Sequence, residues 1–336
     1  MEPASISVII PAYNREAILG ETLESLLRQT LPAREIIVVD DGSTDRTAAV
    51  AESCGAPVRV VRQSNAGPAA ARNRGFRESA GEYIHFFDSD DIAVPNKHEV
   101  QVRTLEESGA DIAFGPWIKG IFGAATFCPV NQVYQQHGLP RGDLVQALLS
   151  SWSVVPHACL FRRGIVERCG GFPEDLRVGE DQLMFLRCLL AGARVVHSPG
   201  TLELYRTENM DKITASADGH RRRITEWARF LVSAGQECQA HGIDPRKWFG
   251  FRLRAWICGR DMAALNEPPP PDVVREVAEL SGQSGNTFLA LADFSDKKYA
   301  SIQSRLLGRR GHRSFRMGRL SHLQMELIGR CGYSLQ

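Results

Sequence analysis

Residues 83–91 read YIHFFDSDD, an apolar run that ends in a cluster of acidic side chains. A short, continuous apolar run of this kind is typical of a strand that is covered on both faces, and we expect one at 83–87. Folding alone does not explain the acids that follow, because converging carboxylates repel each other unless a cation or a hydrogen-bond donor lies between them. The stretch therefore predicts a buried strand with a charged site at its carboxyl end.

The same pattern occurs three times upstream of this stretch. The predicted strands are 5–11, 35–39 and 58–61, and the predicted helices are 17–28, 44–53 and 69–79. Strands and helices that alternate with short connections predict an α/β fold with a mostly parallel, Rossmann-like sheet and helices on both faces. Polar residues follow three of these strands, and the carboxyl ends of such strands are where open α/β sheets bind ligands.

Downstream, a helix is predicted at 97–108 and a strand at 111–114, whereas residues 118–140 lack regular periodicity. From about residue 220 onward the β pattern stops and the chain is predicted to be helical. We expect a catalytic domain over 1–219, with halves at about 1–117 and 118–219, followed by a helical C-terminal region over 220–336.

The composition is that of a soluble globular protein, with 43% hydrophobic and 24% charged residues among 336. The eight cysteines form no CxxC pair, which disfavours structural zinc and a disulfide framework. The sequence contains neither an apolar run long enough for a membrane helix nor a signal peptide. We therefore expect a cytoplasmic protein that can still contact the inner face of the membrane.

The net charge of +1 conceals an uneven distribution along the chain. Residues 1–219 carry 21 basic and 28 acidic side chains, whereas residues 297–336 carry nine basic and one acidic. Residues 305–330 form a basic amphipathic pattern that suits an anionic membrane surface. The alternative is a helix that packs on the acidic catalytic domain. Nucleic acid is disfavoured because the tail lacks interleaved aromatic side chains.

The acids after the fourth strand suggest the ligand class. Asp88, Asp90 and Asp91 offer the carboxylate oxygens that Mg²⁺ or Mn²⁺ prefers. The sequence has no GxxxxGK[ST] loop and no GxGxxG after the first strand, so kinase-like and nicotinamide-binding functions lose their main support. A nucleoside diphosphate that is held through a metal remains the favoured ligand.

Five blocks carry a family resemblance. They are SVIIPAYN (7–14), EIIVVDDGSTD (35–45), NAGPAAARNRG (65–75), YIHFFDSDD (83–91) and GGFPEDLRVGEDQLMFLRCLLAG (170–192). In their order and spacing they resemble the family 2 glycosyltransferases, which have the GT-A fold. The resemblance covers roughly residues 5–206.

The resemblance implies a donor pocket at the ends of the first two strands. Pro11, Ala12 and Tyr13 would line the base pocket of a nucleoside-diphosphate sugar, with Tyr13 beside the base. Asp41 or its neighbour Asp40 would accept a hydrogen bond from the base or the ribose.

The resemblance also implies which residues bind the diphosphate and which residue accepts the proton. Arg72 would lie by the base or the phosphates, Asp88 would contact the ribose or the sugar, and Asp90 would hold the metal that bridges the phosphates. Asp181 of the Glu180-Asp181 pair would be the general base of an inverting displacement on a hydroxyl of a glycan or lipid-linked acceptor. Because Asp181 begins a predicted helix, the helix N-terminus would favour its ionised form. The other interpretation is that the pair merely complements the helix dipole.

One departure from the family's pattern concerns the metal. Many relatives place a histidine shortly after a Tyr-Arg pair, whereas here Tyr205-Arg206 is followed by Glu208, Asn209 and Asp211. Glu208, Asn209 or Asp211 could substitute as an oxygen ligand, with Glu208 as the candidate, or the site lacks that contact. His157 and His197 remain candidates near the acceptor side, although a histidine among apolar residues is more often structural.

Two other function classes stay open on the sequence alone. A nucleotidyltransferase on a similar sheet is disfavoured, because residues 12–16 (AYNRE) do not match the glycine- and basic-rich segment such enzymes carry after the first strand. A nucleotide-sugar-binding module or scaffold without transfer activity is the main alternative.

Overall fold

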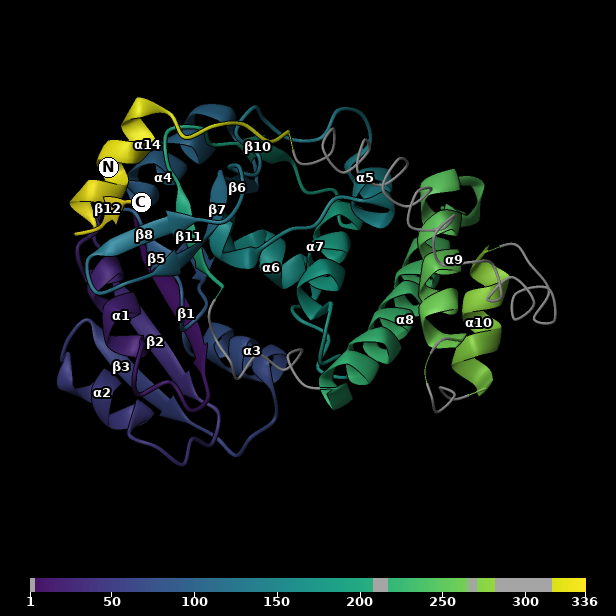
Figure 1. Ribbon diagram of the computed structural model, residues 1–336, viewed down its shortest axis with the longest axis horizontal. Coiled ribbons are helices and arrows are strands. Elements are labelled where there is room, and N and C mark those ends of the chain that lie inside the picture. Colours follow the sequence, from purple (N-terminus) through teal and green to yellow (C-terminus); the bar gives the residue numbers. More distant parts are fainter. Residues whose placement is uncertain (1–3, 208–216, 264, 266–270, 282–315) are drawn as a thin grey trace.

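The predicted buried strands lie in a seven-stranded sheet in the computed structural model, which describes residues 4–207, 217–263, 265, 271–281 and 316–336 (Figure 1). The strand order is β10-β6-β9-β4-β1-β2-β3. The strands are β1 (Ile6–Ala12), β2 (Glu35–Asp40), β3 (Val58–Arg62), β4 (Tyr83–Phe86), β6 (Ile112–Phe114), β9 (Cys159–Arg162) and β10 (Val195–His197). All neighbours are parallel except β9, which runs antiparallel to β4 and β6. The mostly parallel sheet is thus confirmed.

Helices cover both faces of this sheet because its strands are apolar on both sides. On one face, Ile6, Val8 and Ile10 of β1 belong to a core cluster that includes residues of α1 (Leu19–Leu27), α2 (Thr47–Ser53) and α4 (Lys97–Ser108). On the other face, Ile9 belongs to a cluster with residues of α3 (Pro68–Glu78) and α6 (Arg163–Cys169). The period-2 alternation of β1 therefore divides its side chains between two cores.

A second, five-stranded sheet lies beside the acidic residues, in the order β12-β8-β7-β11-β5. Its strands are β5 (Ile92–Ala93), β7 (Trp117–Phe122), β8 (Thr126–Pro129), β11 (Glu203–Arg206) and β12 (Ser334–Leu335). Two expectations are corrected here. The region 118–140, expected to be irregular, contains most of β7 and all of β8, and β12 is a strand in the part expected to be helical. Lys119 and Gly120 interrupt the apolar pattern of β7, and β12 has only two residues. Pairing with distant strands stabilises both.

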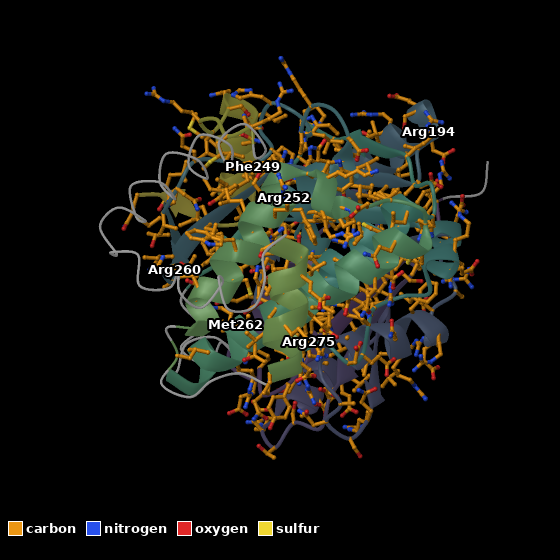
Figure 2. All side chains as sticks on the ribbon, turned by 90° about the vertical axis from the view of Figure 1, so that its right-hand side faces the viewer. Arg194, Phe249, Arg252, Arg260, Met262 and Arg275 are labelled. Atoms are coloured by element: carbon orange, nitrogen blue, oxygen red, sulfur yellow. The ribbon has the colours of Figure 1, made fainter. Side chains whose placement is uncertain are left out.

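Helices α8 (Ala217–Ala240), α9 (Phe249–Ala263) and α10 (Pro271–Ser281) lie at the opposite end of the molecule from α1 and α2 (Figure 1). Their apolar residues share one core cluster with α5 (Leu144–Ser150) and α7 (Glu180–Leu190). Figure 2 shows this side with α9 and α10 in front, and Arg252, Arg260 and Arg275 lie on it. The division into 1–219 and 220–336 stays a prediction. In the described parts of the chain, no helix combines the length and the apolar character needed to cross a membrane.

The basic tail returns to the second sheet. Helix α14 (His322–Arg330) buries Leu327 and Ile328 in a cluster with residues of β5, β7 and β11, while Leu323 stays 46% exposed. Of the apolar face expected over 305–330, Leu320 also packs against this cluster, whereas the exposed Leu323 does not belong to it. The first part of that face, including Phe315, lies outside the described residues. Where the tail is described, it packs on the protein.

Candidate active site

The carboxyl ends of β1 and β2 carry the residues expected to bind the nucleotide. Pro11 and Ala12 are buried in β1, next to Val39 and Asp40 of β2. Tyr13 follows them and is 45% exposed, so its ring is accessible at the sheet edge.

Asp40 ends β2 and Asp41 follows it; both are buried, and both stabilise loops. Asp40 accepts a hydrogen bond from the Ser43 N–H (3.0 Å). The Asp41 carboxylate accepts three, from Gln63 Nε2 (2.7 Å) and from the backbone N–H groups of Ala66 and Gly67 (2.8 Å each). Asp41 thereby holds the loop 63–67 in place.

Gly67 connects that loop to the helix that carries Arg72. It is the N-cap of α3 with a φ of 95°, a conformation that L side chains rarely adopt. A Cβ at this position would also lie 2.5 Å from Nη1 of Arg177. Asp41 and Gly67 together set the direction in which α3 begins, and Arg72 lies about one turn into that helix.

Arg72 joins the acidic cluster to helix α7. Its Nη2 donates to Asp88 Oδ1 (2.8 Å) and its Nη1 to Glu180 Oε1 (3.0 Å). Arg72 and Glu180 are 6% and 8% exposed, so both ion pairs lie largely out of water. The sequence alone does not predict this bridge, because Arg72 and Glu180 belong to different motifs and lie 108 positions apart in the chain.

Gly179 begins helix α7 and positions its two acids. The glycine is the N-cap with a φ of 84°, and a Cβ there would lie 3.2 Å from the Phe230 ring of α8. Glu180 and Asp181 occupy the first turn, and Asp181 Oδ1 accepts a hydrogen bond from the Gln182 N–H (2.7 Å). Packing of α8 on the Gly179 turn therefore sets where both carboxylates lie.

The four residues of the acidic loop, 88–91, are held from two sides. Nδ1 of His157 is hydrogen-bonded to Oδ2 of Asp88 (3.1 Å). It also lies 3.1 Å from Oδ2 of Asp91, a buried oxygen that has no hydrogen-bond partner. His157 is fully buried in a short 3-10 turn, Pro156–Ala158, before β9. From the other side, Arg206 donates its backbone N–H to Asp91 Oδ1 (2.8 Å) and Nε–H to the Asp90 carbonyl (2.9 Å).

These contacts separate the pKa values of the acids. Burial alone would raise the pKa of Asp88, but Arg72 and the His157 hydrogen bond outweigh it and hold this pKa well below its ordinary value. Burial, followed by the charges of Asp90 and Asp88, raises the pKa of Asp91 well above its usual range. Burial and the adjacent Glu180 raise the pKa of Asp181 to about 7, so they outweigh the helix N-terminus that was expected to favour its ionised form. The site therefore contains an ionised acid beside a group that accepts a proton near neutral pH.

The donor set fits a divalent cation. Among the described residues, the ligand atoms of Asp88, Asp91 and His157 lie within 4.8 Å of one another. Asp90 follows Asp88 by two residues and is partly exposed. Carboxylate oxygens with one imidazole nitrogen are ligands that Mn²⁺ accepts, and carboxylates alone suit Mg²⁺.

Sequence reasoning missed His157 and Arg206 as parts of this site. His157 was placed near the acceptor side, as a histidine among apolar residues, and no local pattern marks it as a partner of the acids. His197 instead contacts the Gln135 carbonyl (2.7 Å). Glu208, Asn209 and Asp211 lie outside the described residues.

The family model named Glycosyl transferase family 2 matches residues 7–170. Glycosyltransferase GlyG of Streptococcus pneumoniae serotype 4 is 42% identical over 255 residues, which cover 71% of this chain and 82% of GlyG. The uncharacterized glycosyltransferase EpsJ of Bacillus subtilis is 33% identical over 219 residues, or 62% of each protein. The match thus spans less than two thirds of EpsJ, and it spans 30% of a Rickettsia felis relative.

Solved structures agree on the fold. S. aureus TarS, residues 1–349, has a TM-score of 0.59 at 20% identity, covering 92% of this chain and 86% of that one. A structure of the same segment in complex with UDP-GlcNAc has a TM-score of 0.57 at 17% identity, covering 88% and 92%. At such identity the likeness concerns architecture, and it confirms the expected GT-A type of fold. The family match covers β2 and β4 and the Asp41 and Asp88 that follow them, and together with GlyG it shows that the chain belongs to glycosyltransferase family 2.

Proposed function

We propose that the protein is an inverting glycosyltransferase that moves a sugar from a nucleoside-diphosphate sugar, most suitably a UDP-sugar, to a hydroxyl of a glycan or lipid-linked acceptor. The observation that carries this proposal is the double ion pair of Arg72 with Asp88 and Glu180. It joins the loop assigned to the donor with the helix assigned to the base. In this proposal residues 1–219 form the catalytic domain, and about 1–117 and 118–219 bind donor and acceptor.

The donor half would use the ends of β1 and β2. Pro11, Ala12 and Tyr13 would contact the base, and the accessible Tyr13 ring supports stacking there. The Asp40 and Asp41 carboxylates shape the adjoining loops and would contact the base or the ribose.

The diphosphate would lie beside the acidic loop. Asp90 and Asp88 would hold Mn²⁺ or Mg²⁺, with Asp91 and His157 adjoining them. When bound, such an ion supplies charge stabilisation for the leaving nucleoside diphosphate. Arg72 keeps Asp88 ionised and oriented, and its guanidinium adds a fixed positive charge at the site.

Asp181 would accept the proton of the acceptor hydroxyl. Its Oδ1 is oriented by the Gln182 N–H, and its pKa of about 7 lies near the operating pH, where a general base is most effective. Glu180 would orient the pair through Arg72 rather than take the proton, because its carboxylate is tied to the guanidinium.

The experiment compares donor binding with turnover. Thermal shift with UDP and Mn²⁺ reports binding, and release of UDP from UDP-sugars with an acceptor panel reports turnover. We expect Asp90→Ala to weaken UDP binding strongly, and Asp181→Asn to abolish turnover while UDP still binds. Asp175→Asn, an exposed acid of the preceding loop, is the matched control and should behave as wild type.

Two results would contradict the proposal. Intact turnover in Asp181→Asn removes the assigned base. UDP binding by the wild type, without donor hydrolysis or transfer across the panel, favours a nucleotide-sugar-binding module instead.

A further inference from the structure

The last described residues, 316–336, form a segment that returns to the second sheet; we call it the C-terminal segment. Its strand β12 pairs in parallel with β8, and Gly318 exchanges two backbone hydrogen bonds with Val133 (2.9 and 3.0 Å). Figure 1 shows the segment, in yellow, beside β8, β11 and β5 and far from α9 and α10. It is therefore attached at several points to the half of the molecule that carries the acidic loop.

The C-terminal segment also packs apolar side chains against β5, the strand that follows the acidic loop. Leu327 and Ile328 of α14 are buried in a cluster with Ile92 and Val94. Ile92 comes directly after Asp91, the last residue of the acidic loop. Residues from the far end of the chain therefore pack against β5, the strand that follows the acidic loop.

Tyr333 extends this contact to a charged group. Its ring packs edge-on against Phe122 (centroids 5.2 Å apart), and the Arg206 guanidinium lies over the same Phe122 ring at 4.1 Å. Burial raises the pKa of Tyr333 to about 12, and the charge of the nearby Arg206 guanidinium opposes that rise. Tyr333 and Phe122 therefore confine the plane of the guanidinium.

Arg206 in turn contacts the acidic loop directly. Its side chain donates to the Asp90 carbonyl (2.9 Å) and to Glu21 (2.6 Å), and its backbone N–H donates to Asp91 Oδ1 (2.8 Å). The Arg206 side chain is largely buried, at 9% exposure, whereas that of Glu21 is 52% exposed and its pairing alone constrains little. The contacts with Phe122 and Tyr333 are what hold Nε towards the acidic loop.

We propose that the C-terminal segment is a working part of the donor site, in which Tyr333 is a positioning residue that fixes Arg206 and, through it, the acidic loop. The inference rests on the proposed function only in taking the acidic loop as the place where the nucleoside diphosphate binds. It assigns to the end of the chain a role in donor affinity, in addition to its packing on the sheet.

The test removes one hydroxyl and keeps the ring. In the full chain, Tyr333→Phe retains the ring contact with Phe122 but removes the hydroxyl that interacts with Arg206. Tyr83→Phe is the matched control, because its hydroxyl contacts Glu106 and Arg162, at the opposite end of β4 from Asp88. Affinity for UDP with Mn²⁺ is measured by calorimetry, and backbone amide exchange is measured without ligand.

We expect Tyr333→Phe to weaken UDP binding about threefold to tenfold and to raise the donor KM similarly, with kcat within about twofold of wild type. The Arg206 amide, whose N–H is bonded to Asp91, should exchange about threefold to tenfold faster, while α7 amides stay unchanged. Arg206→Lys should show the same losses. Adding Tyr333→Phe to Arg206→Lys should then change little further, because both act through one contact.

The outcomes separate this inference from the proposed function. Unchanged amide exchange and UDP affinity in Tyr333→Phe, or equal effects in Tyr83→Phe, would overturn the role of Tyr333 while leaving the enzyme assignment intact. Additive losses in the double variant would show that Tyr333 does not act through Arg206. A wild type that binds no UDP overturns the proposed donor site, and faster exchange at Arg206 would then still support the positioning contact.

Discussion

Replacing Arg72 with methionine leaves two carboxylates without their shared cation. Asp88 keeps its contact with His157, and its side chain is 27% exposed, so water compensates part of its loss. Glu180 is 8% exposed and loses the partner of its Oε1. Removing one partner of a buried ion pair costs about 3–5 kcal/mol. Because one of the two acids is partly hydrated, we expect the lower end, about 3 kcal/mol of unfolding free energy at pH 7.5.

The loss of stability in Arg72→Met should also depend on pH, in a direction that the pKa shifts determine. In the wild type the pKa of Asp88 is held down, so its ionised form stabilises the fold at every pH above its unfolded value of 3.8. The pKa of Glu180 is already raised by burial, and without Arg72 it rises further. Lowering the pH from 7.5 to 5 then protonates Glu180 in the variant and removes its uncompensated charge. The deficit should shrink to about 1–2 kcal/mol at pH 5.

Urea unfolding at both pH values measures these differences. Arg74→Met is the matched control on the same helix, because its ion pair with Glu78 is exposed and contributes at most about 0.5 kcal/mol. Arg72→Met with Glu180→Gln should recover about 1–2 kcal/mol at pH 7.5, since the double variant buries no unpaired carboxylate at that position. A deficit below about 1 kcal/mol, or one that grows on acidification, would refute the reasoning.

Three further predictions concern the same site. The kcat/KM for sugar transfer should rise with pH through an apparent pKa of about 7, because Asp181 must be ionised to accept a proton; a flat profile from pH 5.5 to 8 contradicts this. His157→Leu should lower stability by about 1–3 kcal/mol in urea unfolding, because the Asp88 carboxylate loses its buried hydrogen-bond partner; an unchanged midpoint contradicts it. Gly179→Ala should lose about 1–2 kcal/mol or more through left-handed strain and the Phe230 contact, together with most transfer activity. Gly170→Ala has similar strain but nothing within 4 Å, so it should lose stability without losing activity, and equal activity in the two variants would contradict the role of Gly179.

Local patterns predicted the elements of the main sheet well. Helix α4 has the predicted bounds, 97–108, and the other predicted elements of the first 115 residues begin and end within three residues of those observed. A continuous apolar run indicates a strand buried on both faces, and an apolar stripe of helical period indicates a helix buried on one face. Both patterns are set by residues close together in the chain, so the sequence shows them directly. The predicted acids at 88–91 and 180–181 likewise stand at element ends, where local sequence marks them.

The second sheet escaped prediction for the opposite reason. Lys119 and Gly120 interrupt the apolar pattern of β7, and β12 has only two residues. β12 pairs with a strand more than 200 positions earlier, at Ser334–Thr126 and Leu335–Phe127. Such pairing depends on backbone groups that every residue carries, so the side-chain pattern contains little trace of it. The same holds for Tyr333, which contacts Phe122 only after the chain has returned to this sheet.

The sequence by itself determined the alternation of strands and helices, the family, and the acids at the ends of β2 and β4. Only the tertiary structure decided which cations meet those acids. Arg72 pairs with Glu180 across the site, His157 contacts Asp88 from a buried turn, and Arg206 donates to Asp91 from the second sheet. Local sequence encodes which residues are buried, whereas the pairing of buried charges depends on how segments distant in the chain pack against one another, and no local pattern records that.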